Sequence, residues 1–149
     1  MTKVVLAVDG GATKTAVKLL QGEHELLSIT GSGSNYQAIG EEKVASELER
    51  LLLQVKELDI AVDAAVFAIA GIDTKLDLQI VRKLVGASVE ASRLTIRNYV
   101  VENDVEAAMR GLCGDKPGAL IISGTGAIGY SFDGKQVYRV GGWGHRVGD

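Results

Sequence analysis

The 149-residue sequence contains one cysteine, one proline and two histidines, and these low counts exclude several kinds of protein. A single cysteine, Cys113, cannot form a disulfide within the chain, nor can it supply a metal or iron–sulfur site built only from cysteines. The two histidines, His24 and His145, lie far apart in the sequence, so the ligand spacing of a zinc site is missing. A lone cysteine is typical of a reducing compartment.

The sequence also has little net charge, and it has no long apolar run. The formal net charge is −3 and the basic residues are scattered, which does not favour nucleic-acid binding. No apolar run approaches the ~18 residues of a membrane helix. The first apolar run, Val4–Val8, is too short for a signal peptide and ends at Asp9. We therefore expect a cytoplasmic protein that binds neither a membrane nor a nucleic acid.

Glycine, in contrast, is abundant. The 19 glycines cluster at residues 10–11, 31–33, 124–129 and 141–148, a pattern typical of loops that build a site. Hydrophobic residues make up 46% of the chain, which is enough for a sizeable core. About 150 residues is a natural size for one domain. We predict one α/β domain over residues 1–149, with Val4–Val8 and Gly118–Ser123 as strands of one sheet.

The stretch Val4–Thr15 is the most informative part of the chain. Val4–Val8 is entirely apolar, which predicts a strand buried on both faces of a sheet. Asp9 follows it, and then Gly10 and Gly11 permit a tight turn lined by hydroxyl and amine groups. A carboxylate beside exposed N–H groups suits a phosphate with its metal ion. An ordinary hairpin turn is an equally good interpretation of Asp-Gly alone.

The residues after this turn do not form a Walker loop, which requires the spacing GxxxxGK[ST] before a helix. Thr15–Leu20 and Leu26–Thr30 instead predict two short strands, joined by a turn at Gln21-Gly22. A strand–loop–strand phosphate cradle is therefore favoured.

Apolar periodicity predicts the remaining elements of the first two thirds of the chain. One helix is expected over Glu41–Leu58, and a second over Thr74–Val85, capped by Asp73 or Thr74 and ended by Gly86. The predicted apolar faces include Leu58 in the first helix and Leu76, Ile80 and Leu84 in the second. Two further strands and a third helix are expected at Ala64–Ala70, Tyr99–Glu102 and Val105–Leu112.

Asn103 and Asp104 lie where a predicted strand gives way to a helix. As a pair they suit helix capping. At the same position the positive end of the helix dipole would keep the Asp104 carboxylate ionised. An ionised carboxylate there can accept a proton from a substrate hydroxyl. Context has to decide between these two interpretations.

Gly124–Gly129 matches the dinucleotide pattern GxGxxG, but its surroundings argue against that function. The pattern should open a helix near the start of a domain, whereas Tyr130–Phe132 and Gln136–Val140 predict a hairpin around an Asp-Gly turn. We predict a second phosphate loop. The stretches Gly31–Tyr36 and Gly141–Asp149 are, taken alone, a surface connection and a mobile tail.

The order DGGATKT, GSGSNYQAIG, AGI, VVEND, LIISGTGAIGY, GGWGHRVGD resembles the N-acetylglucosamine kinase branch of the actin-like ATPase and sugar kinase superfamily. That branch is also called the BadF/BadG/BcrA/BcrD ATPase family. The likeness covers essentially the whole chain, and six ordered motifs are more specific than any single glycine loop. It implies a ribonuclease H-like domain with a mixed five-stranded sheet flanked by helices.

The resemblance also implies a kinase site that uses ATP and Mg²⁺. Asp9 would lie near Mg²⁺, through a water molecule. The nucleotide phosphates would lie against residues of the two glycine loops: Gly10, Gly11, Thr13, Lys14, Thr15, Gly124, Thr125 and Gly126. The sugar would contact a second set: Asn35, Asn103, Asp104, Trp143, Gly144 and Asp149. Asp104 would be the general base for the acceptor hydroxyl of N-acetylglucosamine or another amino sugar.

The sequence departs from the family pattern at three places. Ala12 stands where many relatives have glycine, and Ala127 stands where serine is usual. Relatives also continue beyond Asp149 into a second domain that carries the adenosine site. We therefore expect residues 1–149 to be the N-terminal domain, which by itself binds nucleotide weakly. The C-terminal domain of the same protein is expected to be its partner. A homodimer of the whole protein also stays open.

Two other functions stay open. An ATPase activator of a 2-hydroxyacyl-CoA dehydratase or benzoyl-CoA reductase system belongs to the same broad family, but such proteins hold an iron–sulfur cluster with two cysteines per subunit. A non-catalytic sugar-sensing domain is the other alternative, although no helix-turn-helix precedes Val4. The sequence does not distinguish among amino sugars.

Overall fold

The computed structural model describes residues 2–123 and 127–142. The chain divides after Asp104 into two compact units, each with its own sheet. The first unit contains β1 (Val4–Gly10), β2 (Lys14–Gln21), β3 (His24–Ser32), α1 (Tyr36–Ile39), α2 (Glu41–Lys56), β4 (Ala64–Ile69), α3 (Lys75–Ser92) and β5 (Tyr99–Asn103).

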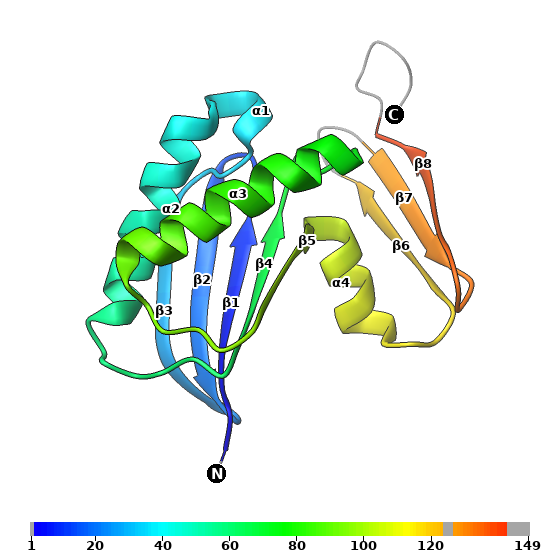
Figure 1. The fold of residues 1–149 in the computed structure, drawn as a ribbon. Helices are drawn as coiled ribbons and strands as arrows, with labels where there is room; N and C mark the ends of the chain where they lie inside the picture. The colour runs from blue at the N-terminus through cyan, green and yellow to red at the C-terminus, as the bar shows by residue number, and fades with distance from the viewer. Residues whose placement is uncertain (1, 124–126, 143–149) are drawn as a thin grey trace. The chain divides into compact units, whose positions relative to one another are not determined.

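The first unit is built on a mixed five-stranded sheet in the order β3-β2-β1-β4-β5 (Figure 1). The first three strands form an antiparallel meander, and β4 and β5 run parallel to β1. This confirms the mixed five-stranded sheet flanked by helices. Because β1, β4 and β5 are parallel, their carboxyl ends meet at one edge of the sheet.

Helices α2 and α3 pack on one face of this sheet and form the core with it. Alternate residues of β1 are buried against the helices, among them Leu6 and Val8, whereas Val5 and Ala7 on the opposite face are only half-buried. The prediction that this strand is buried on both faces is therefore wrong. Both helices of the first unit that are long enough to cover the sheet lie on the same face.

Helix α3 continues past the glycine that was predicted to end it. It runs to Ser92, and Arg93 follows in the left-handed conformation as its C-cap. Gly86 costs helix stability, but burial of Val85 and Ser88 on the core side outweighs that cost. Thr74 is the N-cap, as one of the two predicted alternatives.

Two leucines assigned to buried helix faces are exposed. Leu58 is 38% exposed because α2 ends before it, at Lys56. Leu76 is 64% exposed because the buried stripe of α3 runs through Asp77, Val81 and Leu84 instead. Leu76 lies one residue off this stripe, which turns it about 100° away from the core.

The second unit is a small antiparallel sheet with a helix against one face. It contains α4 (Asp104–Cys113, which begins at the last residue of the first unit), β6 (Gly118–Ser123), β7 (Ala127–Phe132) and β8 (Val137–Gly141). The sheet order is β6-β7-β8, and Val105, Met109 and Tyr130 form its core.

The structure corrects one prediction for this region and confirms another. Gly118–Ser123 is a strand, but it belongs to the three-stranded sheet and not to the sheet of β1. It is also largely exposed, with Ile121 at 77%. Leu112 of α4, the last residue of the helix predicted over Val105–Leu112, is 73% exposed. The predicted hairpin is present as β7 and β8, so a strand and not a helix begins at Ala127.

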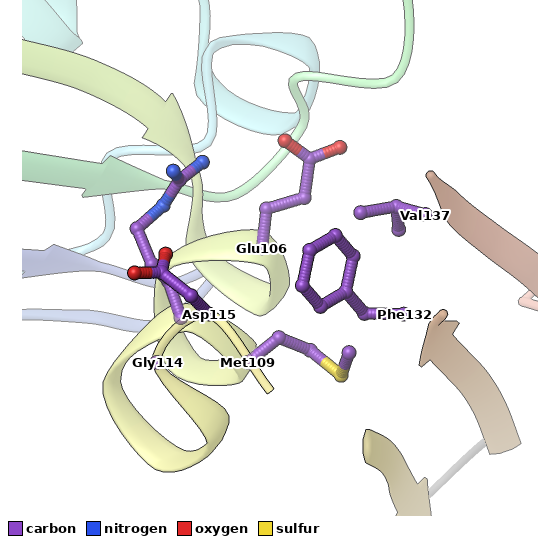
Figure 2. Close-up of a pocket in the computed structure, with 7 residues that line it drawn as sticks. Glu106, Met109, Gly114, Asp115, Phe132 and Val137 are labelled. Atoms are coloured by element: carbon purple, nitrogen blue, oxygen red, sulfur yellow. The ribbon is translucent and has the colours of Figure 1, made fainter. Parts of the chain in front are cut away.

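A small pocket opens between α4 and the hairpin of the second unit (Figure 2). Phe132 and Val137 face Glu106 and Met109 across it. Its volume of about 70 Å³ accommodates a few water molecules. Within the part of the chain that the structure describes, no helix is long and apolar enough to cross a membrane.

Candidate functional site

The carboxyl edge of the first unit's sheet brings together the predicted residues that lie at strand ends. Gly10 of β1 is in register with Ile69 of β4, and Ile69 is in register with Asn103 of β5. The glycine turn and Asp104 therefore leave the sheet at the same edge. They are two strand spacings apart, about 10 Å.

Asp9 lies on the face of the sheet opposite the helices, and its side chain is exposed. Ala68 and then Glu102 are its in-register neighbours on β4 and β5. No three His, Cys, Asp or Glu side chains gather into a metal site anywhere in residues 2–123 and 127–142. One exposed carboxylate nevertheless fits Mg²⁺, which proteins commonly hold through one or two carboxylates, water and substrate phosphate.

The turn after β1 is fastened at both ends by backbone hydrogen bonds. Gly11 N–H donates to the Lys14 carbonyl at 2.9 Å, and Ser34 N–H donates to the Gly11 carbonyl at 3.0 Å. Between these bonds Ala12, Thr13 and Lys14 are exposed. A rigid turn with an exposed tip is the form expected of an anion-binding loop.

Two glycines are required by close approach at this turn. A Cβ on Gly10 would lie 2.1 Å from Ser34 Oγ and 2.6 Å from Ile69 Cδ1. A Cβ on Gly33 would lie 2.1 Å from the Ala12 carbonyl oxygen. The segment that follows β3 is thus packed directly against the turn after β1. This close packing explains why glycine is found in both segments, at Gly10 and at Gly33.

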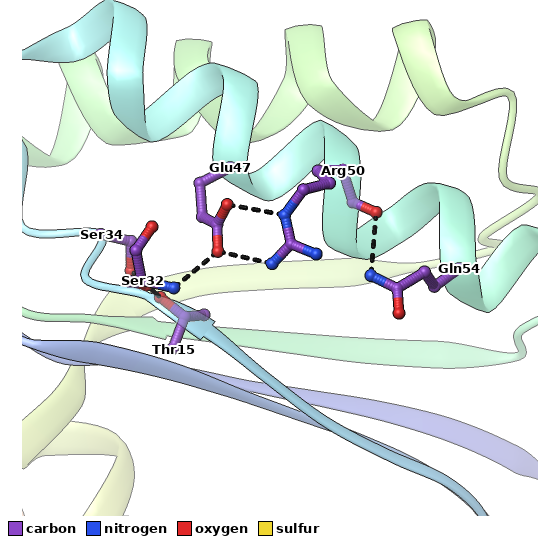
Figure 3. A network of polar contacts seen from close by, with 6 residues as sticks. All are labelled: Thr15, Ser32, Ser34, Glu47, Arg50 and Gln54. Carbon is purple, nitrogen blue, oxygen red and sulfur yellow. Dashed lines mark hydrogen bonds and ion pairs between the residues drawn. The ribbon is translucent and has the colours of Figure 1, made fainter.

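Thr15 holds this packing together instead of facing outward. Its side chain is fully buried, and its hydroxyl donates to the Ser32 carbonyl at 2.7 Å and lies 3.0 Å from Ser34 Oγ. Glu47 of α2 accepts the Ser32 N–H at 2.6 Å and pairs with Arg50 at 2.8 Å (Figure 3). Arg50 lowers the pKa of Glu47, so the anchor stays ionised.

Asn35 caps α1 and lies against the turn between β4 and α3. Its Oδ1 accepts the Gln37 N–H at 3.0 Å. Gly71 in that turn has φ +85°, and a Cβ there would lie 2.5 Å from Asn35 Oδ1. Gln37 Nε2 donates to the Gly71 carbonyl at 2.9 Å. Both a left-handed backbone and a close neighbour therefore demand glycine at this position.

Asn103 reaches the same turn from the other side. It is buried at the end of β5, and its Nδ2 donates to the Ile72 carbonyl at 3.2 Å. Asp104 follows as the first residue of α4 and is half-buried. Asn35 and Asn103 thus contact two adjacent residues of the same turn, Gly71 and Ile72. Asp104 directly follows Asn103 in the chain.

Six of the predicted site residues lie outside the described residues: Gly124, Thr125, Gly126, Trp143, Gly144 and Asp149. The roles of all the predicted site residues stay predictions.

Tyr36 and Asp77 form a polar cluster that was not predicted from the sequence. The Tyr36 hydroxyl donates to Asp77 Oδ1, and Thr74 N–H donates to Oδ2 at 2.6 Å. The Tyr36 hydrogen bond, followed by that of Thr74, lowers the pKa of Asp77, and the same contact raises the pKa of Tyr36. Thr74-Lys-Leu-Asp77 is a capping-box pattern that could have indicated the Thr74–Asp77 part.

The five-stranded sheet, with a glycine turn after its first strand, defines an actin-like ATPase and sugar kinase fold. A solved structure from Porphyromonas gingivalis, provisionally named an N-acetylglucosamine kinase, aligns with TM-score 0.77 and 25% identity over 97% of this chain. A second such structure, from Chromobacterium violaceum, aligns with TM-score 0.69 and 21% identity over 97% of this chain. Each alignment covers 50% of the solved chain, and the second shows the fold alone.

The chain belongs to the BadF/BadG/BcrA/BcrD ATPase family, whose model matches residues 6–149. It is 30% identical over 154 residues to an N-acetylmuramic acid/N-acetylglucosamine kinase of Clostridium acetobutylicum. That alignment covers 99% of this chain and 48% of the relative. The chain therefore spans about half the length of the curated relative it matches.

Proposed function

We propose that this chain forms the sugar-binding and phosphate-binding part of an ATP-dependent amino-sugar kinase, with N-acetylglucosamine as the substrate. One observation carries the proposal. The backbone of the turn after Gly10 and that of Asp104 leave the same sheet edge, two strand spacings or about 10 Å apart, and Asn35 and Asn103 both contact the turn that follows β4, the strand between them. A phosphoryl donor and a hydroxylated acceptor that react with each other must be bound at one edge of this kind, side by side.

In this proposal Asp104 is the general base. It would accept the proton of the acceptor hydroxyl while that oxygen forms a bond to the γ-phosphorus and the bond to the ADP oxygen breaks. Its position at the start of α4 favours the ionised form that this step requires. Asn35 and Asn103 supply side-chain amides, which suit the hydroxyl and acetamido groups of an amino sugar.

The phosphate side would be formed by the exposed turn residues Ala12–Lys14, with Lys14 as a cation and Thr13 as a hydroxyl donor. Asp9 would hold Mg²⁺ through water, and when bound the ion supplies neutralisation of the phosphate charge. Thr15 contributes by fixing the turn, because its hydroxyl is already engaged with Ser32 and Ser34. Gly124–Gly126 would contribute a second phosphate loop.

The adenosine site is assigned to a further segment. The relative from Clostridium acetobutylicum is about twice as long as this chain, since the alignment covers 48% of it. We propose that a second domain supplies the adenosine contacts and closes over the sugar. A kinase that consumes ATP is expected in the cytoplasm.

The proposal is tested with the protein at its natural length, in a coupled assay of ADP release across a panel of amino sugars with ATP and Mg²⁺. We expect ADP release that depends on N-acetylglucosamine, together with a sugar phosphate detected by phosphorus NMR. ADP release independent of any sugar would support the ATPase-activator alternative instead. Saturable sugar binding without phosphoryl transfer would indicate a sensing domain.

A further inference from the structure

Asp77 accepts more hydrogen bonds than a helix cap requires. Its Oδ2 accepts the N–H groups of Thr74 at 2.6 Å and Asp73 at 3.1 Å, and the Thr74 hydroxyl at 2.7 Å. These contacts complete the capping box of α3. Oδ1 is left to the Tyr36 hydroxyl, which comes from α1, 41 residues earlier in the chain. The side chain is buried, with 8% exposure, so water competes little for these bonds.

The Tyr36–Asp77 contact anchors α1, which is too short to be stable as an isolated helix. Helix α1 has four residues, none of them fully buried, and an isolated helix of this length is unstable in water. Its described polar links lead to α3 and to the turn before α3, through Tyr36 to Asp77 and through Gln37 to the Gly71 carbonyl. The N-cap of α1 is Asn35, a proposed sugar ligand.

Asp77 also fixes the turn that Asn103 contacts. The N–H groups it accepts belong to Asp73 and Thr74, directly after Ile72, and the Ile72 carbonyl accepts Asn103 Nδ2 at 3.2 Å. One carboxylate therefore links α1 to the turn between β4 and α3, in addition to the hydrogen bond from Gln37 to the Gly71 carbonyl that joins the same two parts. The two asparagine side chains proposed for the sugar are attached to those two parts.

We propose that Asp77 and Tyr36 are positioning residues for the sugar: their contact sets the spacing of Asn35 and Asn103. This inference rests on the proposed function and adds to it two residues that do not touch the substrate. Because uniform binding of substrate and transition state changes KM, loss of the contact raises KM for the sugar more than it lowers kcat.

A matched control separates positioning from stability. The Ser88 hydroxyl also links α3 to another helix, because it is shared between the Leu84 carbonyl at 2.9 Å and the Ala45 carbonyl of α2 at 3.2 Å. Ser88 lies 11 residues beyond Asp77, three turns along α3 and away from both asparagines. Ser88→Ala and Tyr36→Phe each remove one hydroxyl from an α3 contact.

The experiment compares the wild-type protein at its natural length with Tyr36→Phe, Asp77→Asn, the double variant and Ser88→Ala. We expect Tyr36→Phe and Asp77→Asn each to raise KM for N-acetylglucosamine about tenfold, which corresponds to about one hydrogen bond of sugar-binding energy lost through misplaced asparagines, with KM for ATP unchanged. The double variant should raise KM by less than the product of the two single effects, because both substitutions weaken the same Tyr36–Asp77 contact. Ser88→Ala should leave both KM values unchanged.

A second measurement uses the 149-residue chain without sugar. Tyr36→Phe should shift the side-chain amide NMR signals of both Asn35 and Asn103, and Ser88→Ala should shift neither. Unchanged KM and unchanged amide signals in folded Tyr36→Phe would overturn the positioning role and leave Asp77 as a helix cap only. A wild-type protein that phosphorylates no amino sugar would contradict the proposed function, and shifted amide signals would still support the coupling of the two asparagines.

Discussion

Asp104 lies at the junction between a strand and a helix. It follows the last residue of β5 and is the first residue of α4, so it belongs to the first turn of a helix. The N–H groups of such a turn stabilise negative charge there. Asn103, immediately before it, is held by the Ile72 carbonyl, which limits how far Asp104 can move. A general base needs this combination of fixed position and retained charge.

Asp104→Asn should therefore lower kcat of the protein at its natural length by at least ~10²-fold, the scale of general-base loss. Nucleotide affinity should change little, because the amide keeps the shape of the side chain. The measurement is steady-state kinetics with N-acetylglucosamine. Asp59→Asn is the control, since that side chain is 94% exposed. Near-normal turnover in Asp104→Asn would contradict the general-base role and leave a capping role.

Asp77 makes the stability of the first unit depend on pH. Hydrogen bonds from Tyr36 and then Thr74 hold its folded-state pKa below the ordinary value of 3.8. A lowered pKa adds stability that is complete above the unfolded value and is lost as the pH falls through the folded value.

Asp77→Asn should accordingly reduce the free energy of unfolding by a constant amount above about pH 5, and the deficit should shrink below about pH 4. Urea denaturation of the 149-residue chain and the variant between about pH 3 and pH 7 measures this difference. A deficit that is the same at every pH would show that ionisation of Asp77 does not contribute.

At the scale of elements, local periodicity could predict most of the fold. Each strand and helix of the first unit longer than four residues was expected near its observed position, because one buried face imposes its spacing on the sequence. Only the C-terminal end of α3 was missed by more than two residues, since that helix runs to Ser92 and not to Val85. Membership of a sheet is not encoded in that spacing. Gly118–Ser123 has the composition of a buried strand, yet it pairs with Ala127–Phe132 in a separate and largely exposed sheet.

The site could be predicted only where it follows strand ends. Asp9, Gly10 and Asn103 follow apolar runs, and parallel pairing brings such positions to one edge. Tyr36 and Asp77 gave no comparable signal, because their contact joins residues 41 positions apart on two helices. The burial of the Thr15 side chain was not predicted either, because it follows from the alternation along β2, which directs the hydroxyl toward Ser32 and Ser34.

The unexpected length of α3 supplies a test at the same scale. Gly86 lies inside the helix, and a Cβ there would lie 3.6 Å from the Tyr99 hydroxyl, an ordinary contact. Gly86→Ala should therefore stabilise the chain by about 0.5–1 kcal/mol, the difference in helix preference between the two residues. Chemical denaturation monitored by circular dichroism measures the change.

Gly40→Ala is the control for the backbone explanation. A Cβ at Gly40 meets nothing within 4 Å, but φ there is +88°. The same added methyl group should therefore destabilise the chain at residue 40 while it stabilises at residue 86. Stabilisation at both positions would show that burial of the methyl group, and not backbone conformation, determines the effect.

At the scale of the whole molecule, the two units differ in how well they are buried. The first encloses a large core in which Leu6, Phe67 and Val81 are fully inaccessible to solvent. The second has three core residues, and Ile121 and Val140 on the other face of its sheet are 77% and 73% exposed. The second unit therefore encloses much less apolar surface than the first.

The last prediction concerns the 149-residue chain by itself. Because the five-stranded sheet and its core are complete within residues 1–104, the chain should fold without a further segment. It should nevertheless show no detectable sugar phosphorylation with ATP and Mg²⁺, because relatives are about twice as long and domain closure assembles such sites. Weak binding of N-acetylglucosamine through Asn35, Asn103 and Asp104 should persist.

Circular dichroism, an ADP-release assay and an NMR titration measure folding, phosphorylation and sugar binding of the 149-residue chain, in that order. Turnover similar to that of the natural-length protein would overturn the need for a second domain, and an unfolded chain would show that the first unit depends on it.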